Sequence, residues 1–408
     1  MRLLIADKLH PRAVEELRTL PIDVVYEPEL TKETLETKLQ GIGILVVRSK
    51  EVTRKALESS RTLNLIVRAG AETSTIDVKA ASERGIYVAN CPGKNASAVA
   101  ELVFGMLIAM DRRIPDAVAS LRGGKWERNE YAKAEGLYGK SIGIAGLGAI
   151  GREVAARAKA FGLHPIGWSR SLTAARAAEM GIGYAPSIEE LASRSDILTV
   201  HLLLNDRTKH LIGRRVFDVM PKRSMFVNCA RADLVDYDAM RDAVLQRGLR
   251  AAVDVIPNEP RGKKEVSPEL FNLTTPSSTG GFLYGTPHIA ASTDQAQLAI
   301  ATETVRVIRS FLLEGTVPNV ANVLNVSSAR FQMVIRMQDK VGTFANVLAV
   351  IKRHGINVEE VTNTVFEGGD ASCAKLRVLS RPSEACLHEI RAFEEVLHVD
   401  LVTLPNLA

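Results

Sequence analysis

Hydrophobic residues in the first 90 positions form short continuous runs that alternate with amphipathic stretches. Runs such as Leu3–Ala6 and Gly43–Val47 are apolar throughout, as in strands buried on both faces, whereas Ala13–Leu20 and Thr31–Leu39 carry apolar residues at helical spacing. The pattern predicts a parallel sheet with helices on both faces. The expected strands are Leu3–Ala6, Asp23–Tyr26, Gly43–Val47, Leu63–Val67 and Ile86–Ala89.

The same alternation returns between about Leu137 and Thr286 and predicts a second doubly wound α/β lobe, whose ligands should bind at the carboxyl ends of its strands. A long helix from Asn95 to Leu121, with a wide apolar face, should precede this lobe and bridge two lobes or two subunits. Another helix, reaching about Leu313, should follow it.

The pattern changes after a turn-rich link at Gly315–Asn325. Strand-like Gln332–Met337, helical Thr343–His354, two further strand-like stretches and a final helix give a βαββα order. This order predicts a small α+β, ferredoxin-like module, which could serve regulation or only dimerisation.

Composition narrows the class of protein. A chain of 408 residues suggests two or three domains, and its net charge of +5 is spread without a Lys/Arg run, so we expect no nucleic-acid partner. No apolar segment is long enough for a membrane span, and the four cysteines lack the spacing of a disulfide framework or a metal site. We therefore expect a cytoplasmic protein with no metal and no membrane contact.

A glycine turn joins strand-like Ser141–Ala145 to a helix. Gly146-x-Gly148-x-x-Gly151, with Ala149 and Ile150 between, has the spacing of a dinucleotide-binding βαβ unit, in which the helix start faces the pyrophosphate. We expect a Rossmann-like lobe that binds NAD or NADP. An acid that binds the ribose 2′-hydroxyl usually ends the second strand, but Ser169 and Arg170 stand there, so NADP should be tolerated or preferred.

Polar residues follow three later strands of this lobe. Arg231 follows Met225–Asn228, Asp254 and Glu259 follow the next strand, and His288 follows a third. Singly, each could be an ordinary loop residue. Together they supply an acid/base, a carboxylate to orient it and a cation to hold a substrate carboxylate, a set suited to hydride transfer.

These motifs, in this order over roughly residues 1 to 320, resemble the D-isomer-specific 2-hydroxyacid dehydrogenases. The resemblance implies that Arg231 binds the substrate carboxylate, that His288 exchanges a proton with the substrate oxygen, and that Glu259 orients His288 and favours its protonated form. It also implies that Ala230 lies at the cofactor and that Asp254 meets the nicotinamide carboxamide.

The resemblance extends to two loops that end strands of the first lobe. Arg48, Ser49 and Lys50, and then Gly70 and Ala71, match loops whose backbone N–H groups receive the substrate acid, and Arg48 and Lys50 become candidates for a substrate phosphate. Glu72 and Ser74 depart from the family pattern, which has glycine and asparagine there.

The last segment is similar to an ACT domain, a module that commonly binds amino acids between paired copies; Asp339 and Asn357 match ligand-contacting positions, whereas Met337 replaces a frequent histidine. The layout resembles the 3-phosphoglycerate dehydrogenases within the family and implies a homodimer or homotetramer. Alternatives are a hydroxypyruvate or glyoxylate reductase and, remotely, a dinucleotide-sensing corepressor. The expected domains are 1–96 with 289–320 for substrate, 97–288 for dinucleotide and 326–408 for an amino-acid effector.

Overall fold

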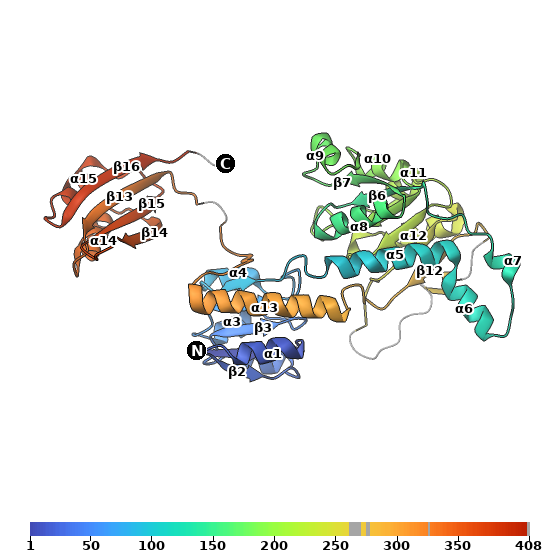
Figure 1. Cartoon of the computed structure of the whole chain (residues 1–408), viewed down its shortest axis with the longest axis horizontal. Coiled ribbons are helices and arrows are strands. Elements are labelled where there is room, and N and C mark those ends of the chain that lie inside the picture. Colours follow the sequence, from blue (N-terminus) through green and yellow to red (C-terminus); the bar gives the residue numbers. More distant parts are fainter. Residues whose placement is uncertain (261–270, 275–277, 325–326, 406–408) are drawn as a thin grey trace. The chain divides into compact units, whose positions relative to one another are not determined.

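The computed structural model describes residues 1–260, 271–274, 278–324 and 327–405. The chain divides into two compact units, Met1–Asn322 and Val323–Ala408. The first unit contains two parallel sheets and the second an antiparallel sheet (Figure 1). The predicted fold class, two doubly wound α/β lobes followed by an α+β module, is confirmed. Residue 326, where we expect the module to begin, lies outside the described residues.

The first lobe is a five-stranded parallel sheet in the order β2-β1-β3-β4-β5. Helices α1 and α13 cover one face, and α2, α3 and α4 cover the other. Helix α13 lies far from this lobe in sequence, yet its buried residues complete the core around the sheet. The strands are β1 (Arg2–Ile5), β2 (Asp23–Tyr26), β3 (Ile44–Val47), β4 (Leu65–Arg68) and β5 (Tyr87–Ala89).

The second lobe is a seven-stranded parallel sheet in the order β12-β11-β10-β9-β6-β7-β8. Helices α5 and α8 pack on one face, and α10, α11 and α12 on the other. The strand order reverses between β6 and β9, which is where a doubly wound sheet binds its ligand. The strands are β6 (Ser141–Ala145), β7 (His164–Trp168), β8 (Gly183–Tyr184), β9 (Ile197–Val200), β10 (Met225–Asn228), β11 (Arg250–Val253) and β12 (Phe282–Gly285).

The helices of the first unit connect these strands. They are α1 (Pro11–Arg18), α2 (Lys32–Lys38), α3 (Arg54–Ser59), α4 (Val78–Glu83), α5 (Ala96–Arg112), α6 (Ile114–Arg122), α7 (Arg128–Tyr131), α8 (Ala149–Ala160), α9 (Ala174–Glu179), α10 (Ile188–Ser193), α11 (Arg214–Val219), α12 (Tyr237–Arg247) and α13 (Asp294–Glu314), with short 3₁₀ turns at Ala232–Leu234 and Phe271–Thr274.

The single helix predicted from Asn95 to Leu121 is wrong, because the chain breaks at Arg113 into α5 and α6. Arg113 adopts a left-handed conformation with φ of 51°. Pro115, in the first turn of α6, has no N–H to continue the earlier helix, and its ring would meet the carbonyl four residues back. The break redirects α6, none of whose residues is buried.

The second unit has the order β13-α14-β14-β15-α15-β16, one strand more than the predicted βαββα. Its sheet is antiparallel in the order β14-β15-β13-β16. The last strand was missed because the pairing of β16 with β13 shifts register between Arg336 and Met337, which interrupts the alternation of apolar residues. The elements are β13 (Phe331–Gln338), α14 (Thr343–Arg353), β14 (Val358–Val365), β15 (Ala371–Val378), α15 (Glu384–Arg391) and β16 (Val396–Thr403).

Candidate active site

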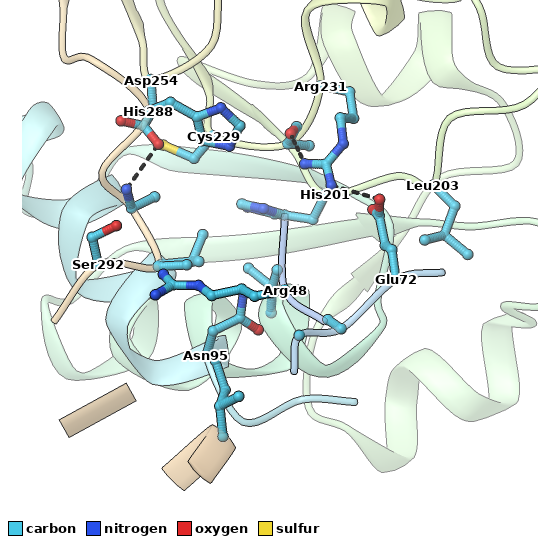
Figure 2. A pocket seen from close by; sticks show the side chains of 18 of the residues that line it. Arg48, Glu72, Asn95, His201, Leu203, Cys229, Arg231, Asp254, His288 and Ser292 are labelled. Carbon is cyan, nitrogen blue, oxygen red and sulfur yellow. Dashed lines mark hydrogen bonds and ion pairs between the residues drawn. The ribbon is translucent and has the colours of Figure 1, made fainter. Parts of the chain in front are cut away.

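A pocket of about 450 Å³ lies between the two lobes of the first unit, at the carboxyl ends of their strands (Figure 2). The first lobe contributes Arg48 and the loop from Arg68 to Glu72. The second lobe contributes the turns after β9, β10 and β12, and Asp254 after β11. The pocket therefore collects Arg231, Asp254 and His288 from separate strand ends, as the geometry of parallel sheets predicts.

His288 and Glu259 form a hydrogen-bonded pair. The His288 Nδ1 donates to Glu259 Oε2 at 2.7 Å, and Glu259 Oε1 accepts from the backbone N–H of Ile256. Because Nδ1 is engaged, Nε2 is the ring nitrogen left for a ligand, and His288 lines the pocket. Glu259 is not among the lining residues, so it acts on the pocket through the histidine.

Asp254 fixes the turn that carries His288. Its buried carboxylate accepts hydrogen bonds from the Thr286 hydroxyl and from the backbone N–H groups of Ile289 and Ala290. The Asp254 carbonyl also accepts the N–H of His288, which has a left-handed φ of 55°. Asp254 lines the pocket, but both carboxylate oxygens already hold this turn; contact with a nicotinamide carboxamide stays a prediction.

Arg231 is held by the turn after β10. The buried Asn228 side chain accepts the N–H of Ala230 and donates to the Arg231 carbonyl, which sets the direction of the arginine. Arg231 Nη1 donates to the Ala230 carbonyl at 2.7 Å, and Nη2 donates to Glu72 Oε2 at 2.5 Å. Neither the role of Asn228 in positioning this turn nor the contact of Glu72 with the arginine was predicted from the sequence.

The first substrate loop departs from expectation because its backbone is already occupied. The buried Asp7 carboxylate accepts the N–H groups of Arg48, Ser49 and Lys50 at 2.7 to 3.0 Å. Burial raises the pKa of Asp7, but these hydrogen bonds outweigh it, so the net shift is downward. The expectation that these N–H groups receive the substrate acid is therefore corrected.

The side chains of this loop diverge. The Ser49 hydroxyl donates to Asp7, and Lys50 Nζ donates to the Pro28 carbonyl and lies 3.6 Å from Asp7. Neither residue lines the pocket, whereas Arg48 does. The assignment of Ser49 and Lys50 to substrate binding is therefore not supported by their contacts, and Arg48 is the residue that the loop presents.

The second predicted substrate loop, with Gly70 and Ala71, lines the pocket, and its binding of substrate stays a prediction. The loop also brings in Arg68, a side chain that we did not assign. Arg68 folds over Gly70 so closely that a Cβ there would lie 1.9 Å from its Nη1. Burial lowers the pKa of Arg68, and its Nε has no hydrogen-bond partner among the described residues. Its position directly at the end of β4 was the available signal.

The glycine turn fits a dinucleotide. Gly146 has φ of 102° and a Cβ there would meet the His201 carbonyl at 2.5 Å, while a Cβ on Gly151 would lie 1.9 Å from the Gly146 carbonyl. Gly148, by contrast, faces open space, and it begins α8 without a side-chain cap. The first-turn N–H groups of Ala149, Ile150 and Gly151 are thus available to phosphate oxygens.

Ser169 and Arg170, the residues predicted to lie at the cofactor ribose, directly follow β7. Ser169 is half-buried and Arg170 is exposed. The Ser169 side chain makes no hydrogen bond among the described contacts. The Ser169 carbonyl accepts the N–H of Leu172. Neither residue lines the pocket beside His288.

His201 and Asn95 are among the further pocket residues that were not predicted. His201 directly follows β9, its Nε2 lies 3.0 Å from the Thr199 hydroxyl, and its Nδ1 has no partner within the described part of the chain. Burial lowers the pKa of His201 to about 3, so the ring is neutral. Asn95 precedes α5 and lines the pocket without capping the helix. Both stand at element ends facing the cleft, which is a weak signal in a sequence.

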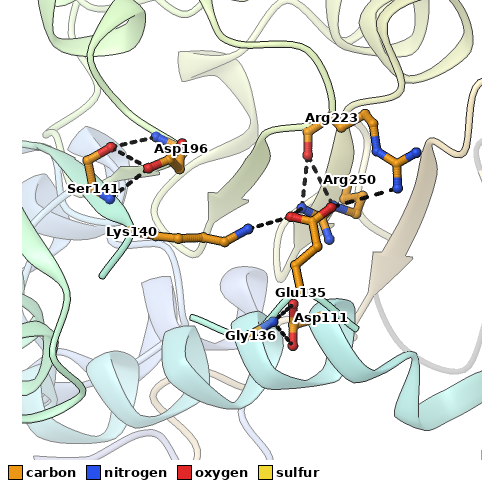
Figure 3. Close-up of polar contacts among 8 residues, drawn as sticks. All are labelled: Asp111, Glu135, Gly136, Lys140, Ser141, Asp196, Arg223 and Arg250. Atoms are coloured by element: carbon orange, nitrogen blue, oxygen red, sulfur yellow. Dashed lines mark hydrogen bonds and ion pairs between the residues drawn. The ribbon is translucent and has the colours of Figure 1, made fainter. Parts of the chain in front are cut away.

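A second polar cluster lies at the opposite edge of the seven-stranded sheet (Figure 3). Glu135 accepts from Lys140 at 2.5 Å and lies 3.6 Å from the buried Arg250, while Asp111 accepts the N–H of Gly136. These contacts fix the segment between α7 and β6. The cluster lies at the strand starts, away from the glycine turn, and its groups are paired with one another.

The predicted effector residues are separated within one chain. Asp339 follows the end of β13, whereas Asn357 precedes β14, and the pairing of both strands with β15 places them at opposite ends of the sheet. Counted along β15, about nine residues, or roughly 30 Å, separate the two positions. A single amino acid cannot contact both within one copy of the module.

Comparison with known proteins finds a matching family model and several similar enzymes. Residues 104–290 match the family described as D-isomer specific 2-hydroxyacid dehydrogenase, NAD binding domain. Over 328 residues the chain is 39% identical to D-3-phosphoglycerate dehydrogenase of Methanocaldococcus jannaschii, covering 80% of this chain and 60% of that protein. The enzyme of the same name from Rattus norvegicus is 35% identical over 356 residues, which cover 85% of this chain and 64% of the rat protein.

A solved structure extends the likeness to the fold. The NAD⁺-bound 3-phosphoglycerate dehydrogenase of Entamoeba histolytica is 26% identical with a TM-score of 0.64, and the match covers 79% of this chain and 99% of that one. The chain spans 60% to 64% of the length of the two curated relatives. No helix in the described ranges combines the length and apolarity of a membrane span. The motifs, the two lobes and these matches agree: the chain carries the NAD-binding domain of the D-isomer-specific 2-hydroxyacid dehydrogenase family and is homologous to D-3-phosphoglycerate dehydrogenases.

Proposed function

We propose that this chain is a nicotinamide-dependent oxidoreductase that interconverts a D-2-hydroxy acid and its 2-keto acid. The observation that carries the proposal is the placement of the His288–Glu259 pair and Arg231 on one pocket beside the glycine turn. An acid/base with its orienting carboxylate, a cation for the substrate acid and a dinucleotide site are the parts that this reaction requires.

Arg231, His288 and Glu259 each have a separate role in this reaction. The Arg231 guanidinium holds the substrate carboxylate and polarises the neighbouring keto oxygen. The protonated His288 then gives its Nε2 proton to that oxygen as the oxygen becomes a hydroxyl, and in the reverse direction the neutral ring takes the proton back. Glu259 accepts the Nδ1 hydrogen throughout, which fixes the ring and stabilises its charged form. A bound nicotinamide ring supplies or accepts the hydride at the substrate's C2.

The charge of the pocket favours a substrate with more than one anionic group. Arg48, Arg68 and Arg231 all line it. A single carboxylate requires only one of these guanidinium groups, whereas a phosphorylated 2-hydroxy acid carries a second group that arginine binds well. We therefore propose 3-phosphoglycerate as the substrate, in agreement with the names of the relatives.

One observation favours a hydroxypyruvate or glyoxylate reductase as the second candidate. Glu72 adds a carboxylate to the pocket, beside Arg231, and so reduces its attraction for a multiply charged substrate. Rates of NADH-dependent reduction of phosphohydroxypyruvate, hydroxypyruvate, glyoxylate and 2-oxoglutarate rank the two candidates. A kcat/KM for phosphohydroxypyruvate below the values for hydroxypyruvate and glyoxylate would favour the hydroxypyruvate or glyoxylate reductase.

We propose NAD as the cofactor. We also predict that the protein tolerates or prefers NADP. The exposed Arg170 and the absence of an acid at Ser169 support NADP, because neither side chain repels a 2′-phosphate. Ser169→Asp should shift the kcat/KM ratio toward NAD by about tenfold, equivalent to about 1.4 kcal/mol. An unchanged preference in both Ser169→Asp and Arg170→Ala would show that this strand end does not read the 2′ position.

We further propose that residues 1–96 with 289–320 bind substrate, that 97–288 bind dinucleotide, and that the second unit is an ACT-like effector module of a homodimer or homotetramer in the cytoplasm. The separation of Asp339 and Asn357 supports an amino-acid site shared by two copies rather than one. Ile114, Val118 and Leu121 on one face of α6 are exposed and support self-association. Removing residues 323–408 should leave the dehydrogenase activity and abolish any inhibition by amino acids.

His288 provides the direct test of the reaction. His288→Gln should lower kcat by about a hundredfold or more while dinucleotide binding is retained. His164→Gln is a matched control, because His164 is an exposed histidine at the start of β7. Turnover of His288→Gln at the control's rate would remove the histidine from the mechanism.

A further inference from the structure

An ion pair joins the two lobes of the first unit across the pocket. Glu72 follows β4 of the first lobe, and Arg231 follows β10 of the second (Figure 2). Arg231 Nη2 donates to Glu72 Oε2 at 2.5 Å, with 34% of the arginine side chain and 27% of the glutamate side chain exposed. The pair is thus partly shielded from water and lies in the wall that a substrate must contact.

The pair occupies the nitrogen that a substrate carboxylate needs. Arg231 Nη1 donates to the Ala230 carbonyl, so each terminal nitrogen already has one of its two N–H groups engaged before any ligand arrives. A guanidinium binds a carboxylate through two N–H groups, either those of Nη1 and Nη2 or those of Nε and Nη2. Nη2 takes part in both arrangements. Because Glu72 belongs to the same chain, its carboxylate is present at a high effective concentration.

We propose that Glu72 is an internal competitor for the substrate-carboxylate site, which a ligand must displace from Arg231 before it can bind productively. This inference rests on the proposed function only for the identity of the ligand. The competition itself requires no more than an anionic group that binds Arg231.

The pocket provides for the displaced carboxylate. Arg68, at the end of the same loop, interacts electrostatically with Glu72 and has an Nε without a hydrogen-bond partner among the described residues. Arg48 is a further cation on the same wall. Displacement therefore moves Glu72 among other cations instead of leaving a carboxylate unpaired in the cleft.

Competition and simple repulsion predict different dependences on ligand charge. A competitor that must leave before any carboxylate binds weakens all such ligands by one common factor. A fixed negative charge that only repels weakens multiply charged ligands more than singly charged ones. We expect a common factor of about ten, equivalent to about 1.4 kcal/mol.

Calorimetric titration of the full-length protein, alone and loaded with NADH, measures this factor without turnover. The probes are oxamate with one negative charge, oxalate with two, and 3-phosphoglycerate, whose phosphate adds roughly two charges to its carboxylate. Glu72→Ala should lower each Kd by about tenfold. Glu72→Asp keeps the charge but shortens the side chain by one methylene, which moves the carboxylate away from Arg231. It should therefore show most of the decrease in Kd expected for Glu72→Ala.

Glu51→Gln is the matched control, because Glu51 is a first-lobe glutamate whose carboxylate pairs with Lys32 instead. It should leave every Kd unchanged. Gains in Glu72→Ala that grow with ligand charge, together with wild-type affinity in Glu72→Asp, would overturn the proposal and leave repulsion alone. Unchanged affinity in Glu72→Ala would overturn it as well.

Kinetics distinguish this inference from the proposed function. If the wild-type protein reduces a 2-keto acid, the same factor should appear as a lower KM in Glu72→Ala. If neither protein reduces any 2-keto acid, the proposed function fails, yet the oxamate and oxalate titrations still decide whether Glu72 competes for Arg231.

Discussion

Glu303 is a buried carboxylate on α13 that joins three segments of the first unit. Its oxygens accept from Arg306 on the same helix at 2.5 Å, from Asn319 after the helix at 2.6 Å, and from Lys94 before α5 at 3.1 Å. Only 7% of its side chain is exposed. The hydrogen bond from Arg306 has the largest influence and, with the other two donors, lowers the pKa of Glu303 from 4.5 to about 2 against the opposing effect of burial.

This shift sets the size of the expected effect. A difference of about 2.5 pKa units corresponds to about 3.4 kcal/mol. Because Arg306 is 52% exposed and solvent screens its charge, we take about 2 kcal/mol as the contribution to stability. The folded pKa lies below the unfolded one, so this contribution is fully present above pH 4.5 and is lost as the pH falls toward 2.

Glu303→Gln keeps the shape and removes the charge. At pH 7 we expect α13 to open more easily by about 2 kcal/mol in the variant, measured by hydrogen exchange of its amides with correction for intrinsic rates. By pH 3 less than half of the difference should remain, because protonation of wild-type Glu303 removes the same charge. Asp294→Asn, an exposed carboxylate at the start of α13, should change opening by less than about 0.5 kcal/mol. A difference between wild type and Glu303→Gln that stays constant from pH 7 to pH 3 would refute the assignment to the carboxylate charge.

Other substitutions test the parts of the site. Glu259→Gln should lower kcat by about tenfold to a hundredfold with little change in KM, because it removes the charge that steadies protonated His288; an unchanged rate in stopped-flow assays would contradict this. Asp7→Asn should raise KM for anionic substrates and lower the melting temperature, since three backbone N–H groups lose a charged acceptor and Arg48 loses its support; thermal unfolding and steady-state kinetics measure both effects. Gly151→Ala should weaken NADH binding, followed by cofactor fluorescence, because its Cβ would lie 1.9 Å from a carbonyl oxygen of the glycine turn; wild-type affinity would show that the turn can move aside.

The two α/β lobes and the gathering of the main site residues could be predicted from the order of residues alone. Continuous apolar runs predict strands buried on both faces, and parallel strands bring their carboxyl ends to one edge wherever the intervening helices lie. Arg231 and His288 therefore share a pocket although the motifs that contain them are far apart in the chain. The glycine spacing is similarly local, because it is set by the backbone of one turn.

Some local signals were present but were not interpreted correctly. Pro115 marks the end of α5, and we nevertheless expected an unbroken helix. The register shift opposite Arg336 hides β16, because an irregularity moves the apolar residues out of strict alternation. Both errors arise at a single position, a helix break in one case and a register shift in the other, and such a position is hidden in the average pattern.

Which polar groups already have hydrogen-bond partners depends on how the folded chain packs. Asp7 takes the backbone N–H groups that we expected a substrate to take, from 41 to 43 residues away in the chain. Glu72 reaches Arg231 across 159 residues and between lobes. A sequence pattern records which side chains lie at a strand end but not their partners, because hydrogen-bond distances depend on how separate loops pack against one another in three dimensions.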